Sequence, residues 1–366
     1  MEETLRKRLQ DSKRIVIKLG TSILLDKNGY PSRDHFAKLV KAIARLHDDG
    51  KEIVVVSSGA IGAGLKVMGI AKRPKKLPDL QMAASIGQSY LLSLYSELFG
   101  AHTIRIGQVL LTHDDLRNRV RHLNARNAFL SLRKNRIVPI VNENDVVSVD
   151  EIRVGDNDVL ASLVAMLVGA DALILATTAP GFYRSTKAGK KELVSHISRV
   201  TDEHFEHTKG KGSELSTGGM ATKLRAADNV VQMGGLCAII DGREPKNIVD
   251  VMQGKPVGTI LGSVKQPAKV KKRKQWIAFF NRVQGSVVVD DGAKKALLEN
   301  NKSLLPVGIT KVIGNFGVGS VVNVQDKSGN VIACGLSEYS SSDIDQLKGK
   351  TPADEVIHRD NFWTNI

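Results

Sequence analysis

Three polar, glycine-bearing segments lie where a β-strand is expected to hand over to a loop or helix. They are Ile17–Ser22 (IKLGTS), Ser57–Gly64 (SSGAIGAG) and Thr217–Lys223 (TGGMATK). Glycine lets the backbone approach phosphate or carboxylate oxygens, and lysine neutralises their charge. Ligands of open α/β sheets bind at the ends of strands. The lysines Lys18 and Lys223 therefore predict a phosphoryl-transfer site.

Each segment also has a plainer interpretation. Lys18 could be an ordinary lysine at a strand end. Ser57–Gly59 could be a tight turn with serine as helix N-cap, although the N–H groups of a helix start would suit a carboxylate as well as a phosphate. Thr217–Lys223 opens a predicted helix and places Lys223 one turn inside it. The chain contains no GxxxxGK[ST] motif, and no GxGxxG follows the first strand, so P-loop and Rossmann interpretations lose support.

Acidic and amide side chains form a further cluster in an otherwise basic chain. Asn142–Asp145 (NEND) follows a predicted strand, and Gly155–Asp158 (GDND) comes shortly after it. Such groups could bind an ammonium, orient lysines or hold Mg²⁺, and Asp158 could also be a simple helix N-cap. The segment His204–His207 (HFEH) lacks HExxH spacing and favours a solvated surface. No pairing of Ser, His and Asp or of Cys and His follows from spacing.

Composition narrows the class of protein. The length of 366 residues suits two domains, and 42% apolar residues can form real cores. A net charge of +15 favours anionic partners, while 4% aromatic residues argue against a single-strand binder built on stacking. The charged N-terminus predicts no secretory signal, and Val159–Ala176 is interpreted as a buried helix and strand, not a membrane span. Two distant cysteines fit a reducing cytoplasm.

Strands and helices alternate over the first two-thirds of the chain, which predicts βαβ units, a largely parallel sheet and an α/β fold. Helices are expected at residues 34–49, 79–99, 114–135, 159–168 and 221–233. Pro139 suggests an edge or irregular place for the strand at 137–141. The expected strands are 14–18, 53–57, 104–112, 137–141, 172–176 and 236–241.

The pattern changes after about residue 260. Residues 264–274 carry six lysines and arginines and no acid, which is typical of a solvated linker and also open to a nucleic-acid patch. Short strand-like runs follow at residues 285–290, 308–314, 319–325 and 330–335, indicating a small β-rich module. The predicted domains are a catalytic domain at 1–262, a basic linker at 263–280 and the β-rich domain at 281–366.

The ordered set of segments resembles the amino acid kinase superfamily. It comprises IVIKLGTS, VSSGAIGAG, LNARNA, IVPIVNENDVV, VGDND and STGGMATK. Their order and wording are most similar to members that phosphorylate the γ-carboxylate of L-glutamate in the first step of proline biosynthesis. SLLPVGITKVIGNFGVGSVV and VIHRDNFW are similar to a PUA domain. The resemblance implies an open sheet sandwiched by helices, with a PUA-like barrel.

The resemblance also implies ATP and Mg²⁺ as cofactors and a role for each matching residue. Lys18 and Lys223 would stabilise the phosphoryl group, and Asp158 would orient both lysines. Ser58, Asp145 and Asn157 would bind glutamate, with a backbone N–H from Gly59. No residue is assigned as a protein ligand of a metal. The nucleotide would contact Lys18, Gly20, Thr177, Thr178, Thr217, Gly218, Gly219, Met220, Ala221, Thr222 and Lys223.

The residues agree with that chemistry. A glutamate γ-carboxylate, with a reference pKa of about 4.3, is ionised near neutral pH and needs no general base. Bringing two anions together and stabilising the moving charge requires cations and backbone dipoles. One departure is Thr178, where the family often has aspartate, and it puts nucleotide affinity or base preference in question.

Two alternatives and several partners stay open. An acetylglutamate kinase-like enzyme would not need Asp145 as counter-ion to an ammonium, so the NEND and GDND segments favour a free amino acid. An RNA-binding protein that uses the PUA-like module is the alternative from another class. Proline as feedback inhibitor and a homo-oligomer, dimer or tetramer, are implied by the family alone. The expected location is the cytoplasm, without membrane association.

Overall fold

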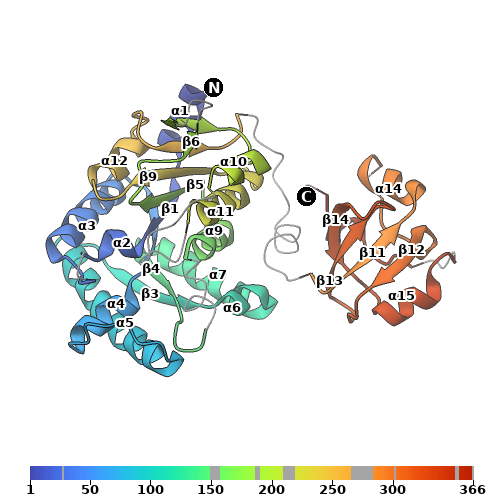
Figure 1. Ribbon diagram of the computed structural model, residues 1–366, viewed down its shortest axis with the longest axis horizontal. Coiled ribbons are helices and arrows are strands. Elements are labelled where there is room, and N and C mark those ends of the chain that lie inside the picture. Colours follow the sequence, from blue (N-terminus) through green and yellow to red (C-terminus); the bar gives the residue numbers. More distant parts are fainter. Residues whose placement is uncertain are drawn as a thin grey trace. The chain divides into compact units, whose positions relative to one another are not determined.

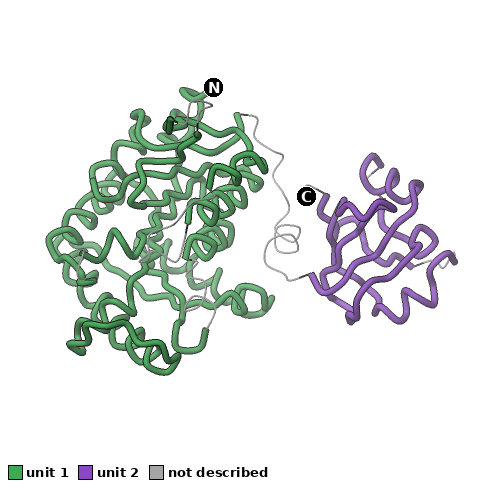
Figure 2. The backbone as a smooth tube through the Cα atoms, in the orientation of Figure 1, with its two compact units in different colours: residues 1–268 green, residues 269–366 purple. Residues whose placement is uncertain are grey.

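The computed structural model describes residues 1–26, 29–148, 157–185, 190–208, 219–264, 283–300, 302–350 and 354–364 (Figure 1). The chain divides into two compact units, Met1–Ala268 and Lys269–Ile366, drawn in different colours in Figure 2. Each unit has its own buried apolar core, as expected for separate domains.

The first unit is built on an eight-stranded sheet with the order β3-β4-β2-β1-β5-β9-β10-β8. The pairing of β9 with β10 is antiparallel, and the other pairings of this sheet are parallel. Central strands are buried on both faces, so their sequences are continuous apolar runs such as ALILAT. The strands are β1 (Arg14–Leu19), β2 (Glu52–Val56), β3 (Ile106–Leu111), β4 (Val138–Glu143), β5 (Ala172–Thr177), β8 (His196–Ile197), β9 (Leu236–Asp241) and β10 (Thr259–Leu261).

Helices cover both faces of this sheet (Figure 1). One layer contains α7 (Arg119–Lys134), α9 (Asn157–Val168) and α11 (Met220–Gln232), and the other contains α3 (Arg33–Asp48), α5 (Leu77–Gly100) and α12 (Lys246–Met252). The structure confirms the predicted α/β class. The unit also contains α1 (Glu2–Asp11), α2 (Thr21–Leu24), α4 (Ala60–Val67), α6 (His113–Arg117), α10 (Asp202–Glu206), and the hairpin of β6 (Tyr183–Ser185) and β7 (Lys191–Leu193).

Helix α3 shows how the sequence specifies these layers. Ser32 caps its start by accepting a hydrogen bond from the N–H of His35. Phe36, Leu39, Val40 and Ile43 recur at helical spacing and are buried against the core. The apolar face therefore docks on the sheet, and the charged residues between these positions face solvent.

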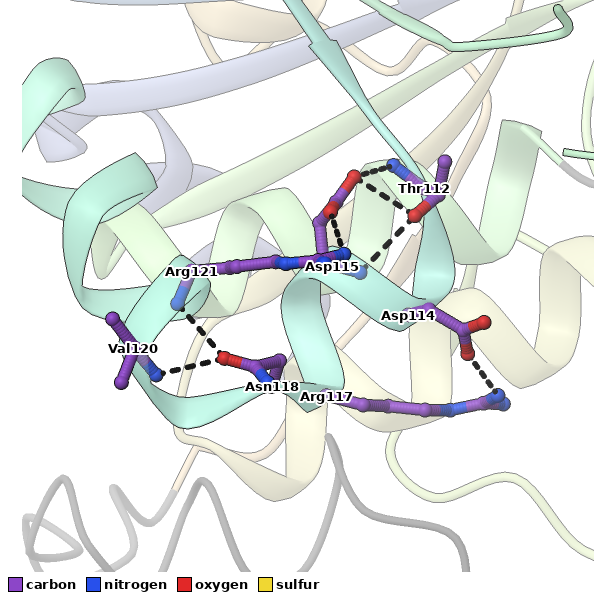
Figure 3. Close-up of polar contacts among 7 residues, drawn as sticks. All are labelled: Thr112, Asp114, Asp115, Arg117, Asn118, Val120 and Arg121. Carbon is purple, nitrogen blue, oxygen red and sulfur yellow. Dashed lines mark hydrogen bonds and ion pairs between the residues drawn. The ribbon is translucent and has the colours of Figure 1, made fainter. Parts of the chain in front are cut away.

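The helix predicted at residues 114–135 is wrong as a single helix, because the chain bends at Asn118. The Oδ1 atom of Asn118 accepts hydrogen bonds from the N–H groups of Val120 and Arg121, which caps the start of α7. Thr112 and Asp115 form a reciprocal capping box at the start of α6 (Figure 3). Asparagine competes for backbone N–H groups, so it ends one helix and begins the next.

The suggestion of an edge position for Pro139 is also wrong. Strand β4 lies between β3 and β2, and Pro139 pairs with Gly107 of β3. The pairing of β4 with β2 begins one residue later, at Ile140. The N–H of Val138 bonds to the β3 side, so the missing N–H of the next residue falls toward β2, where no ladder has yet begun.

The second unit is a five-stranded sheet with the order β12-β11-β13-β14-β15, in which β11 and β13 pair in parallel. Among the described residues of this unit, two helices and two short 3₁₀ turns accompany the sheet. Its core includes Val287, Val322, Ile357 and Phe362. The elements are β11 (Gly285–Val289), α14 (Asp291–Leu298), η1 (Pro306–Gly308), β12 (Ile309–Ile313), β13 (Val321–Gln325), β14 (Val331–Leu336), α15 (Ser341–Leu347), η2 (Arg359–Asn361) and β15 (Phe362–Trp363).

The remaining features are the position of the N-terminal helix, the question of membrane-spanning helices and the predicted linker. Helix α1 packs against α12 and β10 at the far end of the first unit's sequence, so the N-terminal helix closes the fold. Among the described residues, no helix combines the length and apolar character needed to cross a membrane. The predicted linker at 263–280 falls almost entirely outside the described residues.

Candidate active site

The candidate site lies at the carboxyl ends of β1, β2, β4 and β5. From β1 the sheet grows through β2 and β4 on one side and through β5 and β9 on the other. This is the topological switch point at which open α/β sheets bind ligands. In the register of the sheet, Lys18 lies opposite Val56 of β2 and Leu175 of β5. The three predicted glycine-bearing segments therefore start from, or approach, one edge.

Lys18 and Lys223 meet on the two oxygens of one carboxylate. Lys18 Nζ lies 2.7 Å from Asp158 Oδ1, and Lys223 Nζ lies 3.0 Å from Asp158 Oδ2. The exposed fractions are 8% for Lys18, 7% for Lys223 and 1% for Asp158, so the cluster is almost dry. The structure thus brings together three residues from three elements, β1, α9 and α11, with Lys223 65 positions beyond Asp158 in the sequence.

The charge state of Asp158 follows from this arrangement. Burial alone raises the pKa of a carboxyl group, but the nearby ammonium groups of Lys18 and Lys223 outweigh it and lower the pKa of Asp158 to about 2. Asp158 is therefore an anion near neutral pH. An ammonium has three N–H donors, so contact with Asp158 does not exhaust the donors of either lysine.

The start of α11 provides the second part of the site. Gly219 is the N-cap residue. Thr222 Oγ1 lies 3.1 Å from Asp158 Oδ2 and 2.9 Å from the Gly219 carbonyl, so its single O–H donates to one of these two acceptors. A Cβ atom added at Gly219 would meet no heavy atom of the described residues within 4 Å, so the space that these residues leave beside the helix start is open. A helix N-terminus with an open approach and a lysine one turn in can hold a phosphate.

A buried polar network forms the third part, at the ends of β2 and β4. Asn157 Nδ2 lies 2.9 Å from Ser58 Oγ, 3.1 Å from the Ser57 carbonyl and 3.1 Å from Asn142 Oδ1. Gly59 adopts φ +89° at the N-cap of α4, a conformation that favours glycine. The predicted substrate residues Ser58, Gly59 and Asn157 therefore adjoin one another.

Asp145 follows β4 and is also buried, with an exposed fraction of 6%. In the same loop Ser148 donates to Glu143 Oε1 at 2.5 Å, and Gln81 donates to the Val146 carbonyl at 2.8 Å. These contacts tie the loop after β4 to its own strand and to α5. A buried carboxylate in such a loop is suited to a cationic group of a ligand.

The described residues that are predicted to contact the nucleotide lie in three places: after β1, at the end of β5 and at the start of α11. Gly20 follows Lys18, and a Cβ added to it would lie 3.7 Å from Lys18 Nζ. The Thr177 carbonyl accepts from the Gly242 N–H at 2.8 Å, and Thr178 follows it at the end of β5. Gly219, Met220, Ala221, Thr222 and Lys223 form the start of α11. Thr217 and Gly218 lie outside the described residues.

Two site-adjacent residues carried no sequence signal. Gln88 accepts from Asn142 Nδ2 at 2.8 Å, and the Tyr95 hydroxyl lies 3.0 Å from Ser57 Oγ. Both belong to α5, whose sequence predicts an ordinary packing helix. Burial raises the pKa of the Tyr95 phenol, which keeps its proton.

Within the described residues, no group of three or more His, Cys, Asp or Glu could hold a metal. The rings of His204 and His207 pack near Phe182.

Comparison with known proteins places the chain in a class. Residues 13–241 match the model of the Amino acid kinase family, and residues 285–359 match the PUA domain. A carbamate kinase from Giardia lamblia bound to AMP-PNP superposes with a TM-score of 0.51 at 17% identity, covering 69% of this chain and 99% of that chain. At that identity the likeness concerns the fold alone. The chain belongs to the amino acid kinase family.

Curated relatives narrow the class further. The Glutamate 5-kinase of Chromohalobacter salexigens is 42% identical over 370 residues, covering 98% of this chain and 97% of the relative. The Glutamate 5-kinase of Moorella thermoacetica is 38% identical over 374 residues, covering 99% and 98% respectively. The similarity therefore spans both units.

Proposed function

We propose that this protein catalyses the ATP-dependent phosphorylation of the γ-carboxylate of L-glutamate, the first step of proline biosynthesis. The observation that carries the proposal is the meeting of Lys18 and Lys223 on Asp158, in a chain whose full-length relatives are glutamate 5-kinases. The products are γ-glutamyl phosphate and ADP.

The reaction joins two anions and needs no proton transfer. A γ-carboxylate oxygen forms a bond to the γ-phosphorus of ATP while the bond from that phosphorus to the β,γ-bridging oxygen breaks, leaving ADP. The carboxylate, with a reference pKa of about 4.3, is already the nucleophile near neutral pH. Negative charge moves onto the bridging oxygen, so cations fixed in a dry site supply the main stabilisation.

The residue roles follow from this charge flow. Lys18 and Lys223 stabilise the migrating phosphoryl group with their ammonium charges. Asp158 holds both ammonium groups in place before the substrates arrive, and its low pKa keeps it ionised for that task. Pre-set charges cost little reorganisation during the reaction.

Glutamate is proposed to bind at the buried network beside these lysines. Its α-carboxylate meets Ser58 and the backbone N–H of Gly59 at the start of α4, where a helix N-terminus favours an anion. Its α-ammonium meets Asp145 and Asn157. A buried carboxylate as counter-ion favours a free amino acid over an N-acetylated one, which has no ammonium to pair with Asp145.

ATP is proposed to lie between the start of α11 and the end of β5. Its phosphates adjoin Lys18, Gly20 and the segment Gly219–Lys223, and its nucleoside side adjoins Thr177 and Thr178. In phosphate-binding sites, Mg²⁺ is usually held by one or two protein carboxylates together with the phosphates of the substrate. The described residues, which offer no dedicated cluster of metal ligands, fit an ion that enters with the ATP phosphates. The bound ion would neutralise phosphate charge.

A trapping assay tests the proposal. Wild-type protein with ATP, Mg²⁺, L-glutamate and hydroxylamine should give γ-glutamyl hydroxamate, because hydroxylamine captures the acyl phosphate. N-acetylglutamate tested alongside should give far less product. Equal or greater product from N-acetylglutamate would favour the acetylglutamate kinase-like alternative, and no glutamate-dependent product would refute the proposed function.

Further parts of the proposal concern partners. Feedback inhibition by proline, a homo-oligomeric dimer or tetramer and a cytoplasmic location are proposed by analogy with the family. RNA binding through the PUA domain has weak electrostatic support, because residues 283–366 carry eight Lys and Arg against ten Asp and Glu. Phosphate contacts dominate nucleic-acid affinity. Salt-sensitive RNA retention by the full chain would therefore implicate the lysines of residues 264–274.

A further inference from the structure

In the candidate substrate site, Asn157 Oδ1 has no hydrogen-bond partner among the described residues. Asn157 has an exposed fraction of 1%, and its Oδ1 atom is buried and unpaired there, while its Nδ2 atom lies near three acceptors. A buried carbonyl-type oxygen left without a donor costs free energy. Asn157 Oδ1 can therefore accept a hydrogen bond from a donor of the ligand.

A series of hydrogen bonds sets the orientation of the Asn157 amide, because only one assignment of donors and acceptors satisfies all of them. The Ser57 carbonyl can only accept, so Asn157 must turn its Nδ2 toward it, at 3.1 Å. Asn142 must then turn its Oδ1 toward the same Nδ2, also at 3.1 Å. Reversing Asn157 would place two oxygens against its own Oδ1.

Gln88 of α5 is the far end of this series. With Oδ1 committed to Asn157, Asn142 presents its Nδ2 outward, and Gln88 Oε1 accepts from it at 2.8 Å. Asn142 is 1% exposed, so its Nδ2 depends on a protein acceptor more than a surface amide would. Without that acceptor, the buried Nδ2 of Asn142 loses its hydrogen bond, which favours rotation of the Asn142 amide. The rotated amide would place its Nδ2 against the Nδ2 of Asn157, so two donors would face each other.

We propose that Gln88 is a positioning residue for substrate recognition, acting through Asn142 to keep Asn157 Oδ1 directed at the α-ammonium of the substrate. This inference rests on the proposed function. The Tyr95 hydroxyl, 3.0 Å from Ser57 Oγ, anchors the other end of the same network to the same helix. Helix α5 thus shapes the amino-acid side of the site without contacting the substrate.

The test compares L-glutamate with glutarate, which lacks the α-ammonium. Gln88→Met keeps the side-chain size and removes the acceptor, and Gln88→Glu keeps an acceptor. Loss of one neutral hydrogen bond corresponds to about a 3- to 10-fold effect. Gln88→Met should lower the glutamate-to-glutarate ratio of kcat/KM by that factor and leave the KM for ATP unchanged. Gln88→Glu should restore the ratio to within about twofold of the wild type on the same basis.

The controls separate this role from a structural one. Ser89→Ala changes the next, exposed residue of α5 and should keep the wild-type ratio. Thermal unfolding without substrate checks that each variant is folded, and Gln88→Leu replaces Gln88→Met if the latter fails to fold. A wild-type ratio in the folded acceptor-less variant overturns the inference alone. Absence of glutamate-dependent product in the wild type overturns the proposed function and the inference with it.

Discussion

Gly64 of α4 and Gly87 of α5 meet backbone to backbone. A Cβ atom at Gly64 would lie 1.8 Å from the carbonyl oxygen of Ala83, and one at Gly87 would lie 1.8 Å from that of Ala60. Helices approach this closely only where side chains are absent. Because α4 begins at the predicted substrate residue Gly59, this contact fixes the distance between the substrate segment and α5.

Gly87→Ala should therefore separate the two helices. Overpacking of this kind costs about 1–3 kcal/mol in the free energy of unfolding. We expect that loss in urea titrations, together with a raised KM for glutamate, since Gln88 moves with the helix. Gly100→Ala, at the end of α5 with no heavy atom within 4 Å of the added Cβ, is the matched control and should be nearly neutral. Equal stability of both variants would contradict the close contact.

Asp158 should matter more for stability than the exposed acidic residues of the same unit. Removing one partner of a buried ion pair costs about 3–5 kcal/mol, because it leaves charge buried without compensation. Asp158→Ala should show a loss of that size in chemical denaturation. Asp114→Ala removes the exposed pair with Arg117, which is worth about 0–1 kcal/mol. A loss below about 1 kcal/mol for Asp158→Ala would mean that the lysines are solvated.

The stability that Asp158 contributes should depend on pH in a defined window. Its pKa falls from an ordinary 3.8 to about 2 in the folded protein. A lowered pKa stabilises the folded state above the unfolded value, and this contribution disappears as pH falls through the folded value. The difference in unfolding free energy between wild type and Asp158→Asn should be constant above about pH 4 and shrink by about 2 kcal/mol toward pH 2. A difference that stays constant down to pH 2 would exclude the low pKa.

Lys223→Ala should impair chemistry more than binding. Loss of one fixed donor to a transition-state charge typically lowers kcat by about 10²–10³-fold. We expect a fall of that order in hydroxamate formation, with the KM for glutamate little changed, because the side chain lies at the phosphoryl side of the site. Lys246→Ala, at the start of α12, is a control lysine on another element. Near wild-type turnover of Lys223→Ala would remove the assignment of this lysine.

Asp145→Ala should act on the opposite substrate. Because this buried carboxylate is proposed to pair with the α-ammonium, its loss should raise the KM for glutamate by about 10-fold or more, the scale of a hydrogen bond to a charged group. The KM for ATP should stay within twofold on the same reasoning. Initial rates at saturating ATP measure both values. An unchanged KM for glutamate would argue that the ammonium binds elsewhere.

The sequence predicted the elements around the site because their signals are local. Apolar runs such as ALILAT and the helical spacing of Phe36, Leu39 and Ile43 are visible within a few residues. The glycine and lysine segments sit at strand ends, so the sheet alone brings them to one edge. The convergence of Lys18 and Lys223 needed in addition the packing of α9 beside α11, which no local pattern encodes.

Other features depend on contacts between distant segments. Gln88 and Tyr95 look like ordinary residues of a packing helix, and only the position of α5 beside β2 and β4 gives them polar partners. The break at Asn118 was missed because helical propensity continues on both sides of it, while the decisive cap is a single side chain. The edge position suggested by Pro139 was wrong because edge strands are the commonest place for proline in sheets, whereas here the missing N–H falls where β4 does not yet pair with β2.

The placement of α1 has a consequence for synthesis on the ribosome. Arg6 donates to the carbonyls of Lys255 and Val257, and Arg8 donates to those of Gly234 and Ser263. Helix α1 therefore finds these acceptors only after 226 to 255 further residues have been translated. Until then its two arginines stay in water, and the nascent first unit can close only when its last strand has left the tunnel.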